Sequence, residues 1–186
     1  MADRIPADRA FDDVFADALA SVPEEHRDPE RFVPGVGPLS AAVMLVGEAP
    51  GGQEVAQGEP FVGRAGEQLD RALAAIGRDR GDLYVTNLVK VRPPENRDPH
   101  VAEIAAWRPV LDAEIERVDP AVLVPLGSFA TDAILDVDGT ITDLHGREVE
   151  REGRLVVPSF HPAAALYDRS KVEAIESALA AAFEAA

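Results

Sequence analysis

Cysteine is absent from the sequence. Its absence excludes disulfide bonds, thiolate metal sites and cysteine nucleophiles. The sequence also lacks any run of 18 or more apolar residues, so we expect no membrane span. The first 20 residues are unlike a signal peptide, because Asp3, Asp8, Asp12 and Asp13 interrupt the apolar positions. We therefore expect a cytoplasmic protein, and we expect it to be a monomer.

Positive charge is scarce as well. The sequence has 18 basic and 34 acidic residues, a net charge of −16, and Lys90 and Lys171 are its only lysines. Such an acidic chain is not expected to attract nucleic acid. The composition also fits adaptation to high salt, where the Debye length falls to about 3 Å at 1 M. Distant acidic residues would then hardly repel a phosphate backbone, so a DNA partner stays open.

Short apolar segments, predicted as strands, alternate with amphipathic segments, predicted as helices. The predicted strands cover residues 41–46, 83–86, 121–126 and 155–157, with a weaker strand or hairpin at 140–149. The predicted helices cover residues 8–20, 66–76, 101–117, 128–135 and 171–185. This alternation is typical of an α/β fold with helices on both faces of a mostly parallel sheet.

The organisation along the chain is simple. Five prolines punctuate the first forty residues. We expect residues 1–40 to form an N-terminal helix and a proline-rich loop packed on a domain of residues 41–186.

Polar and glycine-rich clusters follow four of the predicted strands. They are residues 47–52, Asn87, residues 127–128 and His161. Ligands of parallel sheets bind beyond the carboxyl ends of the strands. The sequence therefore predicts one active-site edge.

Residues 47–52 could contact a ligand through their backbone, and Phe61 could contact it through its ring. The glycines of residues 47–52 let a ligand approach the backbone, although the segment is neither a Walker loop nor a dinucleotide fingerprint. A tight turn with a solvated carboxylate is the alternative. Phe61, between Pro60 and a glycine, could stack on a flat ring or could be a core residue at a helix start.

The segment after the second strand carries polar and basic side chains. Asn87 offers a donor and an acceptor that match the edge of a pyrimidine, or else it caps a turn. Lys90, Arg92 and Arg97 form the basic stretch nearest the predicted edge and suit phosphate contacts. His161 can donate a hydrogen bond to charge on a leaving group. No set of His, Asp and Glu has metal-ligand spacing, so we expect no metal.

Together these segments closely resemble family 4 of the uracil-DNA glycosylase superfamily over residues 41–183. The matching blocks are residues 47–51 (GEAPG), 58–66 (GEPFVGRAG), 84–94 (YVTNLVKVRPP), 126–127 (LG) and 161–164 (HPAA). The resemblance implies a three-layer α/β/α domain with a central four-stranded, mostly parallel sheet. It also implies an enzyme that flips deoxyuridine out of DNA and hydrolyses the N-glycosidic bond.

The resemblance also implies roles for individual residues. Phe61 would stack on uracil and Asn87 would read its N3–H and O4 edge, beside the turn residues Gly47 and Ala49. Glu54 would crowd the uracil C5 position and disfavour thymine. His161 would stabilise charge on uracil O2. A loop would wedge into the gap left by the flipped base, and its residues are Ala163, Ala164 and Leu166.

Two departures from the family qualify the resemblance. Family-4 enzymes carry four cysteines that bind an iron–sulfur cluster, whereas Val91 and Trp107 occupy two of the expected cysteine positions here. We therefore expect no cofactor, and apolar packing in the cluster's place. A catalytic aspartate of family 1 is replaced by Ala49. Either Glu48 is the water-activating carboxylate, or the reaction depends on stabilisation of the leaving group alone.

Two other functions remain open on the sequence. One is a superfamily relative that captures uracil-DNA, or becomes covalently attached to it, without turnover. The other is a hydrolase of free nucleosides or nucleotides, which suits the acidic composition.

Overall fold

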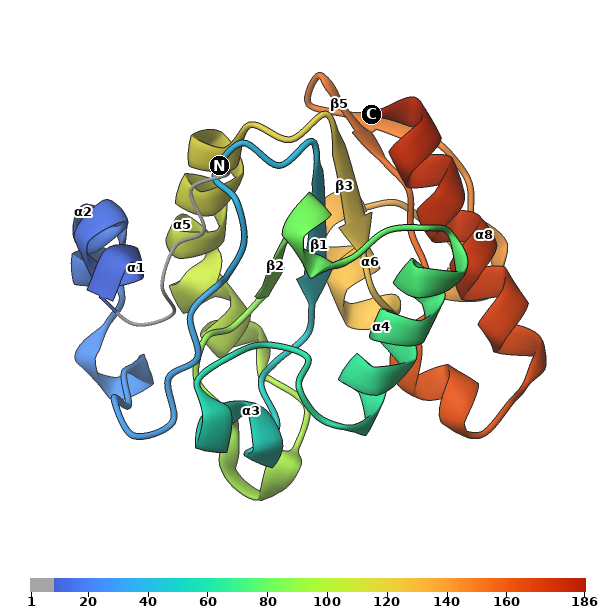
Figure 1. Ribbon diagram of the computed structural model, residues 1–186. Coiled ribbons are helices and arrows are strands. Elements are labelled where there is room, and N and C mark those ends of the chain that lie inside the picture. The colour runs from blue at the N-terminus through green and yellow to red at the C-terminus, as the bar shows by residue number, and fades with distance from the viewer. Residues whose placement is uncertain (1–8) are drawn as a thin grey trace.

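The fold is built on one central sheet, seen in a computed structural model that describes residues 9–186 (Figure 1). The strand order is β2-β1-β3-β5-β4. The first four of these strands run parallel, and β4 pairs antiparallel with β5. The strands are β1 Val43–Gly47, β2 Leu83–Asn87, β3 Val122–Pro125, β4 Val149–Arg151 and β5 Arg154–Val156.

The predicted α/β sheet is confirmed, with one strand more than expected. Its four parallel strands correspond to the four predicted ones, and the edge strand β4 is the fifth. The strand or hairpin predicted for 140–149 is wrong over its first half, where Ile141–Leu144 form helix α7. The hydroxyl of Thr140 accepts from the backbone N–H of Asp143 at 3.3 Å, and this cap favours a helix. The hairpin follows, turning at Glu152 and Gly153.

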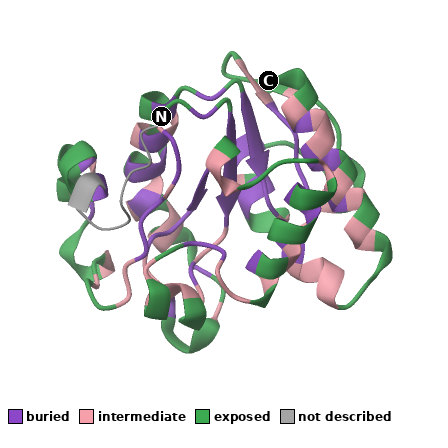
Figure 2. Ribbon diagram, viewed as in Figure 1, coloured by how far each residue is buried: buried purple, intermediate pink, exposed green. Residues whose placement is uncertain are grey.

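Both faces of the sheet are covered, as the predicted three layers require. Side chains alternate between the faces of a strand, so Val43 and Leu45 contact one apolar cluster and Met44 and Val46 another. Helices α4 Arg64–Ala75 and α8 Ser170–Ala185 pack on the first face. Helices α5 Val101–Val118 and α6 Ser128–Leu135 pack on the second. Figure 2 shows the buried strands between helices whose outer faces are exposed.

The N-terminal helix is divided in two. The predicted start at Asp8 lies outside the described residues, and from there the chain forms α1 Arg9–Val14 and α2 Ala16–Ser21, broken at Phe15. The remaining short elements are α3 Gly52–Gln57 and the 3-10 turns Glu24–His26, Arg80–Asp82, Pro94–Asn96 and Pro162–Leu166. Within residues 9–186, no helix has the length and apolar character needed to cross a membrane.

Four aromatic rings join the N-terminal segment to α5. Phe11 lies 4.6 Å from Phe15 and 5.9 Å from Phe32 between ring centroids, and Phe32 lies 6.0 Å from Trp107. We call these four residues the aromatic cluster. Backbone bridges join Phe32 to Val91 and Val36 to Val85, so the segment also covers the outer edge of β2.

The aromatic cluster should stabilise the fold by fixing the N-terminal segment on α5. Trp107 is 3% exposed, so we expect Trp107→Ala to lower the free energy of unfolding by about 3–5 kcal/mol. Val101, on the same helix, is 85% exposed, so Val101→Ala should change it by less than about 0.5 kcal/mol. Denaturant unfolding of both variants tests this, and equal midpoints would contradict it.

Candidate active site

The loops that follow the parallel strands meet at one edge of the sheet, as predicted. Gly47 and Asn87 are register partners at the ends of β1 and β2. Beyond β3, Leu126 bridges Ser159, and the backbone N–H of Gly127 donates to the carbonyl of Ser159 at 2.8 Å. His161 follows two residues later and packs on Gly127. The end of the sheet thus gathers the predicted asparagine and histidine.

Gly47 permits the closest contact in the site. A Cβ atom at this position would lie 2.4 Å from Oδ1 of Asn87 and 2.5 Å from Cζ of Phe61. Only glycine leaves room for both side chains. Phe61 and Asn87 are 5% and 3% exposed, so water is nearly excluded from the place where they meet.

Phe61 is held in a strained backbone conformation. Its φ is +55°, which costs a side-chain-bearing residue about 1–3 kcal/mol. The guanidinium of Arg80 donates to the carbonyls of Pro60 (2.9 Å) and Phe61 and pairs with Asp70. The ring of Phe61 lies 5.6 Å from that of His161, tilted by 32°. Phe61 therefore belongs to the core and borders the site at the same time.

His161 is fixed in one tautomer by its own loop. The backbone N–H of Ala163 donates to Nδ1 at 3.1 Å, so in the neutral ring Nε2 carries the proton. Burial lowers the pKa of His161, and the nearby Glu54 carboxylate acts in the opposite direction. The side chain is therefore a neutral hydrogen-bond donor at neutral pH.

Glu54 connects two loops of the site. Its Oε2 accepts from the backbone N–H of Gly51 at 3.1 Å, and its Oε1 accepts from that of Gly63 at 3.2 Å. Glu54 lies in helix α3, which was not predicted. Two features of the sequence could have indicated this helix. Glu54 is acidic and lies in its first turn, and Gly58 ends it in the left-handed conformation.

Glu48 is half-buried beside a second carboxylate. Burial raises its pKa, and the charge of Asp98 raises it further. A carboxylate with a raised pKa is a stronger base near neutral pH. Asp98 was not predicted from the sequence, because its approach to Glu48 depends on a loop in which Glu95 and Asn96 have positive φ.

A sequence model of the uracil DNA glycosylase superfamily matches residues 34–185. The chain belongs to this superfamily. It is 43% identical to the type-4 uracil-DNA glycosylase of Archaeoglobus fulgidus over 160 residues, 82% of this chain and 80% of that protein. The type-4 enzymes of Thermotoga maritima and Sulfurisphaera tokodaii are each 42% identical, over 78% and 73% of this chain and 77% and 66% of their own.

One predicted DNA contact of this superfamily member is wrong. Lys90 is fully buried, and its Nζ lies 2.5 Å from Oε2 of Glu114. It also donates to the backbone carbonyl of Asn87 at 2.6 Å. Glu114 accepts from the hydroxyl of Tyr84 at 3.0 Å. An ammonium enclosed by these partners cannot reach a phosphate and instead supports the strand end that carries Asn87.

The two arginines predicted to contact DNA lie at the surface. Arg97 donates twice to Glu103, at 2.8 and 2.9 Å, and this pairing lowers the pKa of Glu103 to about 2. Arg92 donates to Oδ1 of Asn96 and lies beside Gly52. Among residues 9–186, Arg92 has no acidic partner, so its charge is available to an anion.

The remaining predicted contacts divide into two groups. Ala49 is half-buried and packs against the apolar cluster around Trp107. The predicted wedge residues Ala163, Ala164 and Leu166 lie in the 3-10 turn after His161. They are half-buried, and this turn contacts both α4 and α8.

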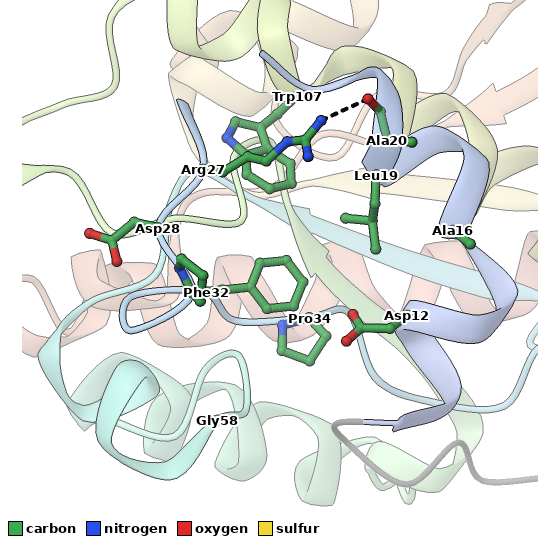
Figure 3. A pocket seen from close by; sticks show the side chains of 11 residues that line it. Asp12, Ala16, Leu19, Ala20, Arg27, Asp28, Phe32, Pro34, Gly58 and Trp107 are labelled. Atoms are coloured by element: carbon green, nitrogen blue, oxygen red, sulfur yellow. Dashed lines mark hydrogen bonds between the residues drawn. The ribbon is translucent and has the colours of Figure 1, made fainter. Parts of the chain in front are cut away.

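The two positions expected to hold iron–sulfur cysteines belong to, or pack against, the apolar cluster that Ala49 also contacts. Trp107 belongs to the aromatic cluster, and Val91 packs against it. An adjacent cavity of about 590 Å³ is lined by Arg27, Phe32 and Trp107 among others, and Arg27 donates to the carbonyl of Ala20 at 2.7 Å (Figure 3). Rings and aliphatic groups supply no thiolate, so the residues present do not fit such a cluster.

We expect the pKa of His161 to lie below its ordinary 6.5, because burial disfavours the imidazolium. Glu54→Gln should lower this pKa further, since it removes a charge that favours the cation. NMR titration of the ring carbons measures both values, with Glu59→Gln as the control for an exposed glutamate. A pKa of His161 above 6.5 in the wild-type protein, or a higher one in Glu54→Gln, would contradict these effects of burial and of Glu54.

Proposed function

We propose that this protein is a uracil-DNA glycosylase that flips deoxyuridine out of DNA and releases uracil by hydrolysis of the N-glycosidic bond. The observation that carries the proposal is the meeting of Phe61 and Asn87 at Gly47, with the ring of His161 5.6 Å from that of Phe61 between centroids. The type-4 relatives, 38–43% identical to this chain, support the same activity. One chain supplies all these groups, so we propose that the protein acts as a monomer. We also propose that it acts in the cytoplasm.

Uracil recognition is assigned to Asn87 and Phe61. The Asn87 carboxamide can accept from N3–H and donate to O4 of uracil. Cytosine presents an amino group in place of O4 and would leave buried polar groups unpaired. Phe61 supplies a flat apolar surface for the ring, and Gly47 and Ala49 let the base approach the backbone.

Bond cleavage is assigned to His161 and Glu48. As the N-glycosidic bond breaks, negative charge develops on uracil O2, and the N–H at Nε2 of His161 donates to it. The sugar becomes an oxocarbenium-like cation, which a nearby carboxylate stabilises. Glu48, whose pKa is raised, is proposed to orient and deprotonate the attacking water.

Rejection of thymine and contact with DNA involve the surrounding loops. We assign Glu54 to the C5 side of the base, where its two backbone hydrogen bonds would keep it from yielding to a methyl group. Arg92 and Arg97 are proposed to contact phosphates. The turn carrying Ala163, Ala164 and Leu166 is proposed to fill the gap left by the flipped nucleotide.

We also propose that the aromatic cluster replaces the iron–sulfur cluster of the family. The chain has no cysteine, and Trp107 lies 6.0 Å from Phe32 between ring centroids, close to where the family would place ligands. Burial of these rings stabilises the attachment of the N-terminal segment. No step of the proposed reaction uses the cluster.

The activity is tested by single-turnover cleavage of a uracil-containing oligonucleotide over a salt series, with thymine and cytosine oligonucleotides as controls. We expect uracil-specific release. His161→Ala should slow it by about 10²–10³-fold, because it removes the donor to the developing anion. His100→Ala, which changes an exposed histidine, should leave the rate within twofold.

Other outcomes would contradict the proposal in distinguishable ways. A heat-stable protein–DNA adduct without free uracil would indicate the covalent binder. Cleavage of deoxyuridine monomers, with binding insensitive to ionic strength, would indicate a nucleoside hydrolase. A rate within a few-fold of wild type in His161→Ala would overturn the role of this residue.

Gly47→Ala should nearly abolish uracil release, because the added methyl group would lie within 2.5 Å of both Asn87 and Phe61. Gly77→Ala is the matched control: its φ of +71° makes alanine unfavourable, but nothing lies within 4 Å of the new Cβ. Both variants should lose about 1 kcal/mol or more of stability by denaturant unfolding, and only Gly47→Ala should lose activity. Equal rates in the two variants would contradict the prediction.

A further inference from the structure

His145 has no role in the proposed reaction, yet it contacts the segment that carries His161. It follows helix α7, and its ring is half-buried. The ring stacks on that of Phe160, with 4.1 Å between centroids and 25° between planes. Phe160 directly precedes His161 in the chain. His145 therefore touches the backbone that sets the position of the proposed catalytic histidine.

Both ring nitrogens of His145 are used. The backbone N–H of Phe160 donates to Nδ1 at 3.1 Å, and Nε2 lies 3.1 Å from the carbonyl oxygen of Ala174 in α8. The neutral tautomer with its proton on Nε2 satisfies both contacts. Burial lowers the pKa of His145, which favours this neutral form at neutral pH. The imidazole thus bridges helix α8 and the strand end before His161.

Further contacts fix the same segment. The ammonium of Lys171 lies 4.1 Å from the centroid of the Phe160 ring, within the range of a cation–π interaction. The backbone N–H of Gly146, next to His145, donates to the carbonyl of Pro158 at 2.8 Å. Residues 158–160 are therefore held from the turn after α7 and from α8.

We infer that His145 is a positioning residue for His161, fixing through Phe160 the place at which the His161 ring meets the uracil leaving group. This inference rests on the proposed function. Misplacing a catalytic group by about 1 Å can cost up to about 10²-fold in rate. The hydrogen bond to the Phe160 N–H lies one residue from His161, so its loss should be felt in the chemical step and not in DNA binding.

Two substitutions in the full chain separate the hydrogen bond from the packing. His145→Phe keeps a flat ring against Phe160 but removes both polar contacts. His145→Gln offers a carbonyl that can accept from the Phe160 N–H and an amide that can donate to Ala174. His26→Gln, at a half-buried histidine in the N-terminal segment, is the control. Thermal unfolding establishes that each variant is folded at the assay temperature.

At saturating DNA we expect His145→Phe to lower the single-turnover rate by about 10- to 100-fold, with the DNA dissociation constant within twofold of wild type. His145→Gln should recover most of the rate. The ¹⁵N resonances of the His161 ring, recorded without DNA, should shift in His145→Phe and return toward wild type in His145→Gln.

Several results would overturn the inference. They are an unchanged rate in folded His145→Phe, equal losses in both variants, or a loss confined to DNA binding. If the wild-type protein released no uracil, the proposed function would fail. The ring resonances would still decide the positioning role, because unchanged His161 signals in His145→Phe would exclude it without reference to activity.

Discussion

The close approach of two parallel strand ends, at Gly47 and Asn87, is the constraint on which the site depends. A side chain at residue 47 would occupy the space now shared by the Asn87 carboxamide and the Phe61 ring. Parallel pairing of β1 and β2 places these residues in register, and the buried apolar strands hold that register. The relative placement of Gly47 and Asn87 is therefore set by the sheet.

The loops add groups that the sheet alone could not hold. Phe61 keeps an unfavourable φ because Arg80 binds its carbonyl and because its ring is buried in the core. Glu54 ties its own helix to the N–H groups of Gly51 and Gly63. Phe61 and Glu54 are thus held by partners from other segments of the chain, which limits the movement of both side chains.

The fold could be predicted from sequence because its signals are local. The alternation of apolar strands and helices predicted the parallel sheet. The glycine, asparagine and histidine that follow the strands predicted which edge of the sheet carries the site. Lys90 could not be placed, since nothing local distinguishes a surface lysine from one whose partner, Glu114, lies 24 residues away on α5. Asp98 and His145 were missed for the same reason. Their contacts exist only after distant loops are brought together.

The enclosed pair of Lys90 and Glu114 has a consequence for a chain with so many acidic residues. Counter-ions weaken attraction between exposed charges, such as Arg108 and Asp112 with side chains 39% and 55% accessible. They cannot enter the space around an ammonium and a carboxylate that are both 0% accessible. High salt that weakens the exposed ion pairs should therefore leave the buried pair, whose ammonium also binds the Asn87 carbonyl, unchanged.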